Sequence, residues 1–105
     1  IVKSVIVADP FGGTQPVPGA TLTYTVAVQV TNIGTAGNST VNDPIPVNTS
    51  YVPNSINLNG APMTDAIDSD AGELNLAGTP SVAVRLGDLT QASGIQTVTF
   101  QVTID

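Results

Sequence analysis

The chain has 105 residues, about the length of one domain, so we expect a single domain over residues 1–105. Eight acidic residues face only two basic ones, Lys3 and Arg85, and a net charge of −6 would repel a phosphate backbone, so nucleic acid is not an expected partner. The sequence has no cysteine and no run of about eighteen apolar residues, which excludes disulfides, thiolate metal sites and a membrane-spanning helix.

The first half of the chain contains its most regular strand pattern. A short run of valine and isoleucine at residues 1–8 predicts a first strand packed against the core. A connector rich in proline and glycine follows at residues 9–18. From Leu22 to Val30, apolar residues alternate with small polar ones through five successive matches to a period of two, which predicts a strand with one face in the core.

The middle of the chain predicts shorter strands separated by turns. A strand over about residues 39–42 ends at Asp43–Pro44, because proline cannot donate to a strand ladder. A pair of strands is expected over residues 51–59, after which Asn59–Gly60 turns the chain back on itself. We expect no regular structure in the acidic residues 65–73.

In the last quarter of the chain, apolar and polar residues alternate again. Residues 81–86 place valine and leucine on one face and Arg85 on the other, and Gly87–Asp88 predicts a turn after them. Residues 96–105 end the chain with a second regular pattern, in which apolar side chains oppose threonine and glutamine. No segment has a helical period over a useful length.

Strands at intervals of roughly ten residues, joined by turn residues, predict an all-β fold, a β-sandwich of about seven strands. The inward positions of the predicted strands supply fourteen core side chains, each of which stabilises the folded chain by roughly 1.5–3 kcal/mol when buried. These are Leu22, Tyr24, Val26, Val28, Val30, Ile56, Leu58, Val82, Val84, Leu86, Val98, Phe100, Val102 and Ile104.

Four carboxylates fall within nine residues of the acidic segment, at Asp65, Asp68, Asp70 and Glu73. Calcium takes about six to eight oxygen ligands, which closely spaced aspartates, backbone carbonyls and a bidentate glutamate can supply. The segment therefore predicts a calcium site with these four residues as metal ligands. A solvated acidic loop is the alternative interpretation, because carboxylates in water repel one another only weakly.

The sequence offers little for catalysis. It has no histidine and no cysteine, so the usual general base and the thiolate nucleophile are missing, and no serine has an identifiable activating partner. We therefore expect no enzymatic activity and no catalytic residue. Lys3 is expected to be solvated or salt-bridged, and the alternative is an amide cross-link to an asparagine or aspartate on another strand. Phe11, beside two glycines in a loop, is the best candidate for an exposed anchor.

Five motifs, taken in chain order, resemble the DUF11 repeat family of bacterial and archaeal surface proteins. The resemblance implies an immunoglobulin-like Greek-key β-sandwich, often present in tandem copies in large secreted or surface-anchored proteins of adhesin or S-layer type. Lys3 matches the lysine near the start of the family's first strand, whereas the long connector at residues 9–16 departs from the family. The five motifs are Pro18–Asn32, Asp43–Pro46, Tyr51–Ile56, Thr64–Gly72 and Thr97–Asp105.

The resemblance implies a structural spacer domain excised from a longer microbial surface protein, with neighbouring repeats as its partners, and the acidic segment adds calcium that would stiffen one loop. One alternative is an adhesive domain that contacts protein or glycan through its loops or a strand edge, and another is an accessory module of a secreted enzyme. An extracellular or cell-surface location is expected, because only 10% of the residues are charged and the remaining polar residues are those common in secreted β-proteins.

Overall fold

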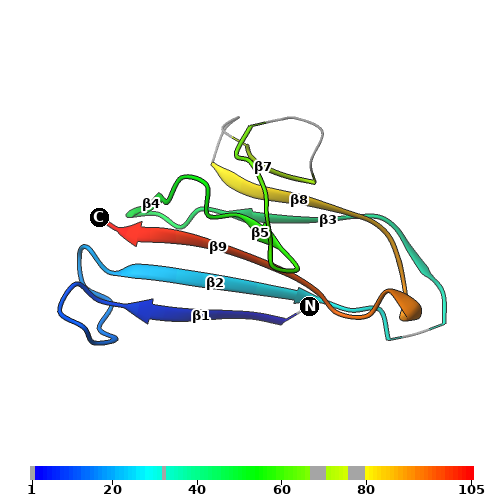
Figure 1. The fold of residues 1–105 in the computed structure, drawn as a ribbon, viewed down its shortest axis with the longest axis horizontal. Helices are drawn as coiled ribbons and strands as arrows, with labels where there is room; N and C mark the ends of the chain where they lie inside the picture. Colours follow the sequence, from blue (N-terminus) through cyan, green and yellow to red (C-terminus); the bar gives the residue numbers. More distant parts are fainter. Residues whose placement is uncertain (1, 32, 67–70, 76–79) are drawn as a thin grey trace.

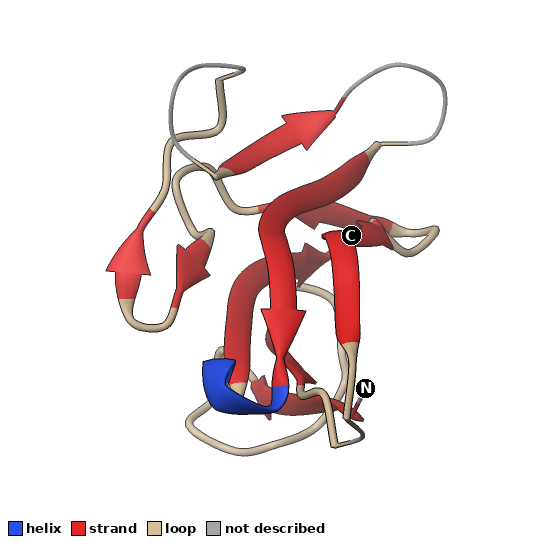
Figure 2. Ribbon diagram, turned by 90° about the vertical axis from the view of Figure 1, so that its right-hand side faces the viewer, coloured by secondary structure: helices blue, strands red, loops and turns tan. Residues whose placement is uncertain are grey.

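A computed structural model describes residues 2–31, 33–66, 71–75 and 80–105 of the chain. These residues form two antiparallel sheets in the manner of a β-sandwich, so the predicted all-β class is confirmed. A short 3₁₀ helix, η1 (Gln91–Ser93), drawn blue in Figure 2, lies between the last two strands. Within the described ranges no helix is long and apolar enough to span a bilayer.

The larger sheet is built on two long central strands, β2 (Thr21–Val28) and β9 (Gln96–Ile104), which pair antiparallel along the whole of β2 (Figure 1). One edge strand covers the free side of β2, and three short strands lie beyond β9. These four strands are β1 (Val2–Ala8), β4 (Thr49–Tyr51), β5 (Asn57–Leu58) and β6 (Ala61–Pro62).

The smaller sheet has three strands in the order β3 (Thr35–Pro44), β8 (Ser81–Thr90) and β7 (Gly72–Asn75). The central strand β8 pairs with both neighbours, and its valines at positions 82 and 84 are fully buried. The described strands therefore number nine rather than about seven, because β6 and β7 were not predicted as separate strands.

The hydrophobic core lies between the two sheets. Antiparallel pairing sets Leu22 opposite Val102, Tyr24 opposite Phe100 and Val26 opposite Val98, so one face of β2 and β9 carries the apolar side chains. The rings of Tyr24 and Phe100 stack with centroids 5.4 Å apart. All fourteen predicted core side chains are buried or half-buried, as expected. Three further buried residues that the pattern did not include are Ala20, Val41 and Leu89.

The Asn59–Gly60 turn forms as predicted. It joins β5 to β6 in a two-residue hairpin, with Leu58 paired to Ala61. Both turn residues have positive φ, 51° at Asn59 and 85° at Gly60, which are the values that a tight hairpin turn of this kind requires.

The first strand lies where the sequence predicted it, but the expectation that it packs against the core is wrong. Among the described strands β1 pairs only with β2, at the outer edge of the larger sheet, and most of its side chains are exposed. Valine and isoleucine on both faces indicated a buried strand, whereas the smaller sheet leaves this edge largely uncovered. Val7 is the residue of β1 that packs against the core cluster.

Two predicted irregular segments belong to strands. Gly87–Asp88 is not a turn, because β8 continues to Thr90 and Gly87, with φ 70°, sits opposite Ser39 at a shift in the strand register. The last residues of the acidic segment also pair, since β7 begins at Gly72. In both cases a neighbouring strand supplies hydrogen bonds that local sequence does not reveal.

Two glycines offer a matched test of this packing. A Cβ added to Gly72 would lie 2.8 Å from the Cβ of Met63, whereas a Cβ added to Gly37 would meet only the Asp88 carboxylate, at 3.7 Å. We expect Gly72→Ala to lower the free energy of unfolding by about 1–3 kcal/mol through overpacking, and Gly37→Ala to have little effect. Chemical denaturation of both variants measures the difference, and equal stabilities would contradict the packing around Gly72.

Candidate functional site

The structure describes two of the four predicted calcium ligands, Asp65 and Glu73. They lie at the two ends of the acidic segment, and each carboxylate binds different protein groups. The other two, Asp68 and Asp70, lie outside the described residues. The structure therefore gives the surroundings of two of the four predicted ligands.

Asp65 holds the turn that follows β4. Its Oδ1 accepts a hydrogen bond of 2.5 Å from the hydroxyl of Tyr51, and its Oδ2 accepts one of 2.8 Å from the backbone N–H of Asn54. Asn54 has φ 60°, a left-handed conformation that asparagine tolerates. The backbone N–H of Leu74 donates to the carbonyl of Asp65 at 2.9 Å, which ties the start of the acidic segment to β7.

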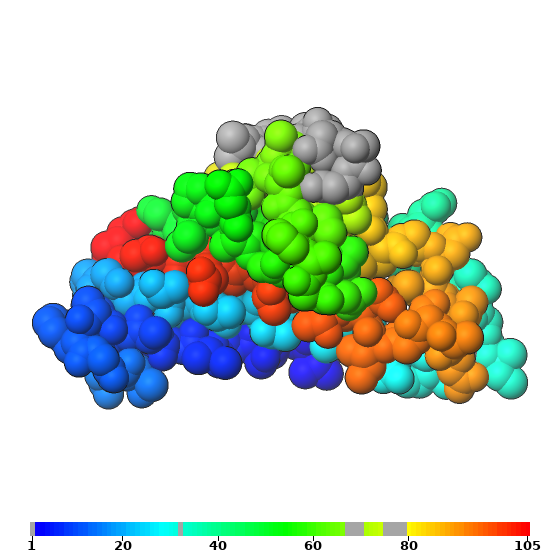
Figure 3. All heavy atoms as spheres, in the orientation of Figure 1, coloured from blue at the N-terminus to red at the C-terminus, as the bar shows by residue number. Residues whose placement is uncertain are grey.

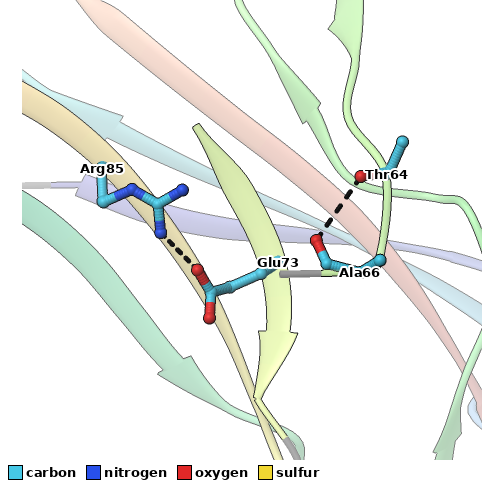
Figure 4. Close-up of polar contacts among 4 residues, drawn as sticks. All are labelled: Thr64, Ala66, Glu73 and Arg85. Carbon is cyan, nitrogen blue, oxygen red and sulfur yellow. Dashed lines mark hydrogen bonds and ion pairs between the residues drawn. The ribbon is translucent and has the colours of Figure 1, made fainter. Parts of the chain in front are cut away.

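Glu73 forms an ion pair with Arg85 on the neighbouring strand β8 (Figure 4). The Glu73 side chain is mostly buried, while that of Arg85 is about half exposed. Figure 4 also includes Thr64, whose hydroxyl donates to the carbonyl of Ala66 at 3.5 Å near the start of the segment. The acidic segment is thus attached at both ends by carboxylates that already have protein partners.

These contacts leave the calcium prediction untested. In the described ranges no three acidic side chains come together in an arrangement that would hold a metal ion. The alternative interpretation, a solvated acidic loop, does not describe Asp65 and Glu73 either, because each is bound to a protein group. The sequence pattern did not reveal these contacts.

A second polar cluster joins the two sheets at their edges. The Nζ of Lys3 on β1 lies 2.8 Å from Oδ1 of Asp43 on β3 and 4.6 Å from the centre of the Tyr24 ring. The Asp43 side chain is mostly buried, and within the described part of the chain its Oδ2 has no hydrogen-bond partner. Removal of Lys3 would leave a buried carboxylate without a counter-charge, so the pair favours this arrangement of the two edges.

The salt-bridged interpretation of Lys3 is therefore confirmed, but its partner was missed. The sequence analysis named no carboxylate for this salt bridge, and the structure supplies one from β3. A signal was present in the sequence, because Asp43 is in phase with Val41 along the strand and both are buried. A carboxylate at an inward position needs a buried partner.

Next to this ion pair, a groove of about 610 Å³ opens between the sheets. Its walls are largely aliphatic, and Lys3 and Asp43 belong to its lining. The apolar lining includes Val28, Val30, Leu86 and Leu89. The described residues that line the groove include no histidine, no cysteine and no carboxylate besides that of Asp43.

The connector between β1 and β2 carries Phe11, the residue that the sequence suggested as an exposed anchor. The carboxylate of Asp9 accepts hydrogen bonds from the backbone N–H groups of Phe11, Gly13 and Gln15, at 2.7–3.0 Å. These bonds, of which the one from Gly13 is the main contributor, lower the pKa of Asp9. Phe11 is 87% exposed on this turn, as expected.

Comparisons of the chain with models of known protein families, with curated proteins and with solved structures find no match. The resemblance to DUF11 repeats therefore stays a prediction. The class that the structure itself defines is an all-β domain of two antiparallel sheets.

The Tyr51–Asp65 contact predicts a dependence of stability on pH. Burial, and then the hydrogen bond to the Asp65 carboxylate, raise the pKa of Tyr51 from 10.0 to about 12. The folded chain therefore keeps this proton at higher pH than the unfolded chain does. The resulting stability is complete below pH 10 and is lost as the pH rises toward 12.

We expect the tyrosinate absorbance of a Tyr24→Phe variant, in which Tyr51 is the remaining tyrosine, to titrate near pH 12 when folded and near pH 10 in denaturant. Adding Asp65→Asn removes the carboxylate and should lower the folded midpoint. A folded midpoint near 10 in the Tyr24→Phe variant would contradict the contact.

Proposed function

We propose that this chain is a non-catalytic structural domain that acts as a spacer in a microbial cell-surface or secreted protein. The observation that carries the proposal is the direction of its first and last strands. β1 and β9 are both antiparallel to β2, so they run parallel to each other. The chain therefore enters at one end of the larger sheet and leaves at the opposite end (Figure 1).

This geometry supports a role as one domain in a row of domains that are joined end to end. Val2 pairs with Ala27, which pairs with Thr97 at the beginning of β9, while the end of β9 at Ile104 lies seven residues further along. At about 3.4 Å per residue this separates the entry and exit points by roughly 24 Å. The domain has a long axis of 46 Å against 27 and 22 Å for the other two. Copies joined end to end would add length rather than bulk.

A tail-to-head fusion of two copies tests the spacer role. We expect small-angle scattering to give an elongated particle whose maximum dimension exceeds the 46 Å of one copy by at least the roughly 24 Å between the entry and exit points. A fusion in which a long Gly/Ser linker replaces the direct junction serves as the control, because its domains should sample shorter separations. A compact, folded-back particle for the direct fusion would contradict the proposal.

The DUF11 resemblance and the low charge content support the surface location and an immunoglobulin-like arrangement of the sandwich. Neighbouring repeats are then the natural partners. The acidic segment adds calcium to the proposal, as an ion that stiffens residues 65–73 between the two anchors Asp65 and Glu73.

Calcium should raise the melting temperature if this segment holds the ion. With the dissociation constants of roughly 10⁻⁴–10⁻³ M that are typical of extracellular modules, calcium at about 10 mM would stabilise the chain by about 1.4–2.7 kcal/mol. Asp68→Asn with Asp70→Asn should abolish the shift. Asp105→Asn, outside the segment, should preserve it. An unchanged melting temperature in millimolar calcium would rule out the ion and leave the spacer role standing.

A second candidate function is adhesion through the connector at residues 9–16. The exposed ring of Phe11 stands on a turn that the Asp9 carboxylate holds in place, so little conformational entropy would be lost on binding. Saturable binding of the isolated domain to a protein or glycan array would favour this candidate over a spacer.

A further inference from the structure

The outer edges of the two sheets differ in how well they are protected from pairing with another strand. An uncovered edge presents unpaired backbone N–H and C=O groups, and proteins usually blunt such edges with short strands, proline, bulges or charge. The described strands at the edges are β1, β3, β4, β6 and β7.

Four of these five edges carry a recognisable protection. β4, β6 and β7 have only three, two and four residues, and β6 ends at Pro62. β3 is long, but its register with β8 shifts on both sides of Ser39, and the backbone N–H of Asn38 is bound to the Asp88 carboxylate at 2.8 Å. β1 has neither a bulge nor a proline.

β1 is seven residues long and pairs with β2 without any shift in register. It contains no proline and no glycine. Its one charged residue, Lys3, lies on the inner face, where an unpaired charge could protect the edge, but Asp43 binds its ammonium group and neutralises that charge. On the outer face, Val2 and Ile6 are 69% and 67% exposed. β1, in dark blue, lies along the lower margin of the molecule in Figure 3.

We propose that β1 pairs antiparallel with β1 of a second copy, so that the larger sheets of two copies join into one continuous sheet. The strand sequence is compatible with itself about a two-fold axis at Val5. In that register Val2 faces Ala8 of the second copy, Lys3 faces Val7 and Ser4 faces Ile6. Each pair joins residues on the same face, and no pair sets like charges opposite each other.

The same register explains the apolar outer face. It places the Ile6 side chains of the two copies diagonally across the junction, where cross-strand neighbours of this size remain within reach. The Val2 side chains extend the apolar stripe at its two ends. The arrangement closes as a dimer, because each copy brings one unprotected edge and the two-fold axis uses both. The contact is small, so the dimer should be weak and concentration-dependent.

Sedimentation of the whole chain from micromolar to millimolar concentration tests the proposal. The mass should rise from 10.6 kDa toward twice that value. Ile6→Lys adds a charge to the outer face of β1 and should keep the chain monomeric. Val47→Lys adds the same charge at a residue that is 88% exposed and lies outside β1, so it should leave the dimer intact. Thermal melts of both variants establish that each remains folded.

Disulfide cross-linking tests the register of the two β1 strands directly. The chain has no cysteine of its own, so an introduced cysteine can pair only with its copy in a second chain. Val5→Cys should form an intermolecular disulfide about tenfold faster than Val47→Cys, since pairing raises the effective concentration of the two thiols. A native chain that stays monomeric to millimolar concentration would overturn the proposal and leave the edge to a strand of another protein. Dimers that Ile6→Lys leaves unchanged, or equal disulfide rates, would overturn it as well. None of these outcomes bears on the spacer role.

Discussion

The pairing of β2 with β9 is the constraint on which the rest of the structure depends. It joins a strand from the first quarter of the chain to the last strand, and its register places three apolar pairs on one face. The stacked rings of Tyr24 and Phe100 lie at the middle of this pairing. Because side chains alternate with a period of two, a slip of one residue would turn every core side chain of one strand toward solvent. β1, β4 and β5 then add to a sheet whose faces are already determined.

Polar contacts attach the outer segments to this frame. The chain has few charges, yet every acidic side chain in the described ranges accepts a hydrogen bond or forms an ion pair within the protein. These contacts fasten the connector before β2, the turn after β4, the start of β7 and the edge between β1 and β3. The six residues are Asp9, Asp43, Asp65, Glu73, Asp88 and Asp105. A net charge of −6 is therefore compatible with a close-packed domain, because most carboxylates are used locally.

Sequence patterns predicted the strands best where both the period and the turn residues agreed. Leu22 to Val30 and residues 96–105 have a clean alternation, and Asn59–Gly60 can adopt positive φ at both positions. The same reasoning failed at Gly87–Asp88, since a glycine next to an aspartate is typical of turns and also of bulges. Whether a neighbouring strand continues past such a pair depends on residues far away in the chain, here Ser39 on β3.

The sequence by itself determined the all-β class, the residues of the core and a segment rich in carboxylates, because these follow from local periodicity and composition. Only the tertiary structure decided which carboxylate meets which partner. Lys3 and Asp43 are forty residues apart, and Tyr51 and Asp65 are fourteen apart. It also decided that β1 is an exposed edge rather than a buried strand. An apolar run has the same period in both settings, and only the neighbouring sheet determines whether it is covered.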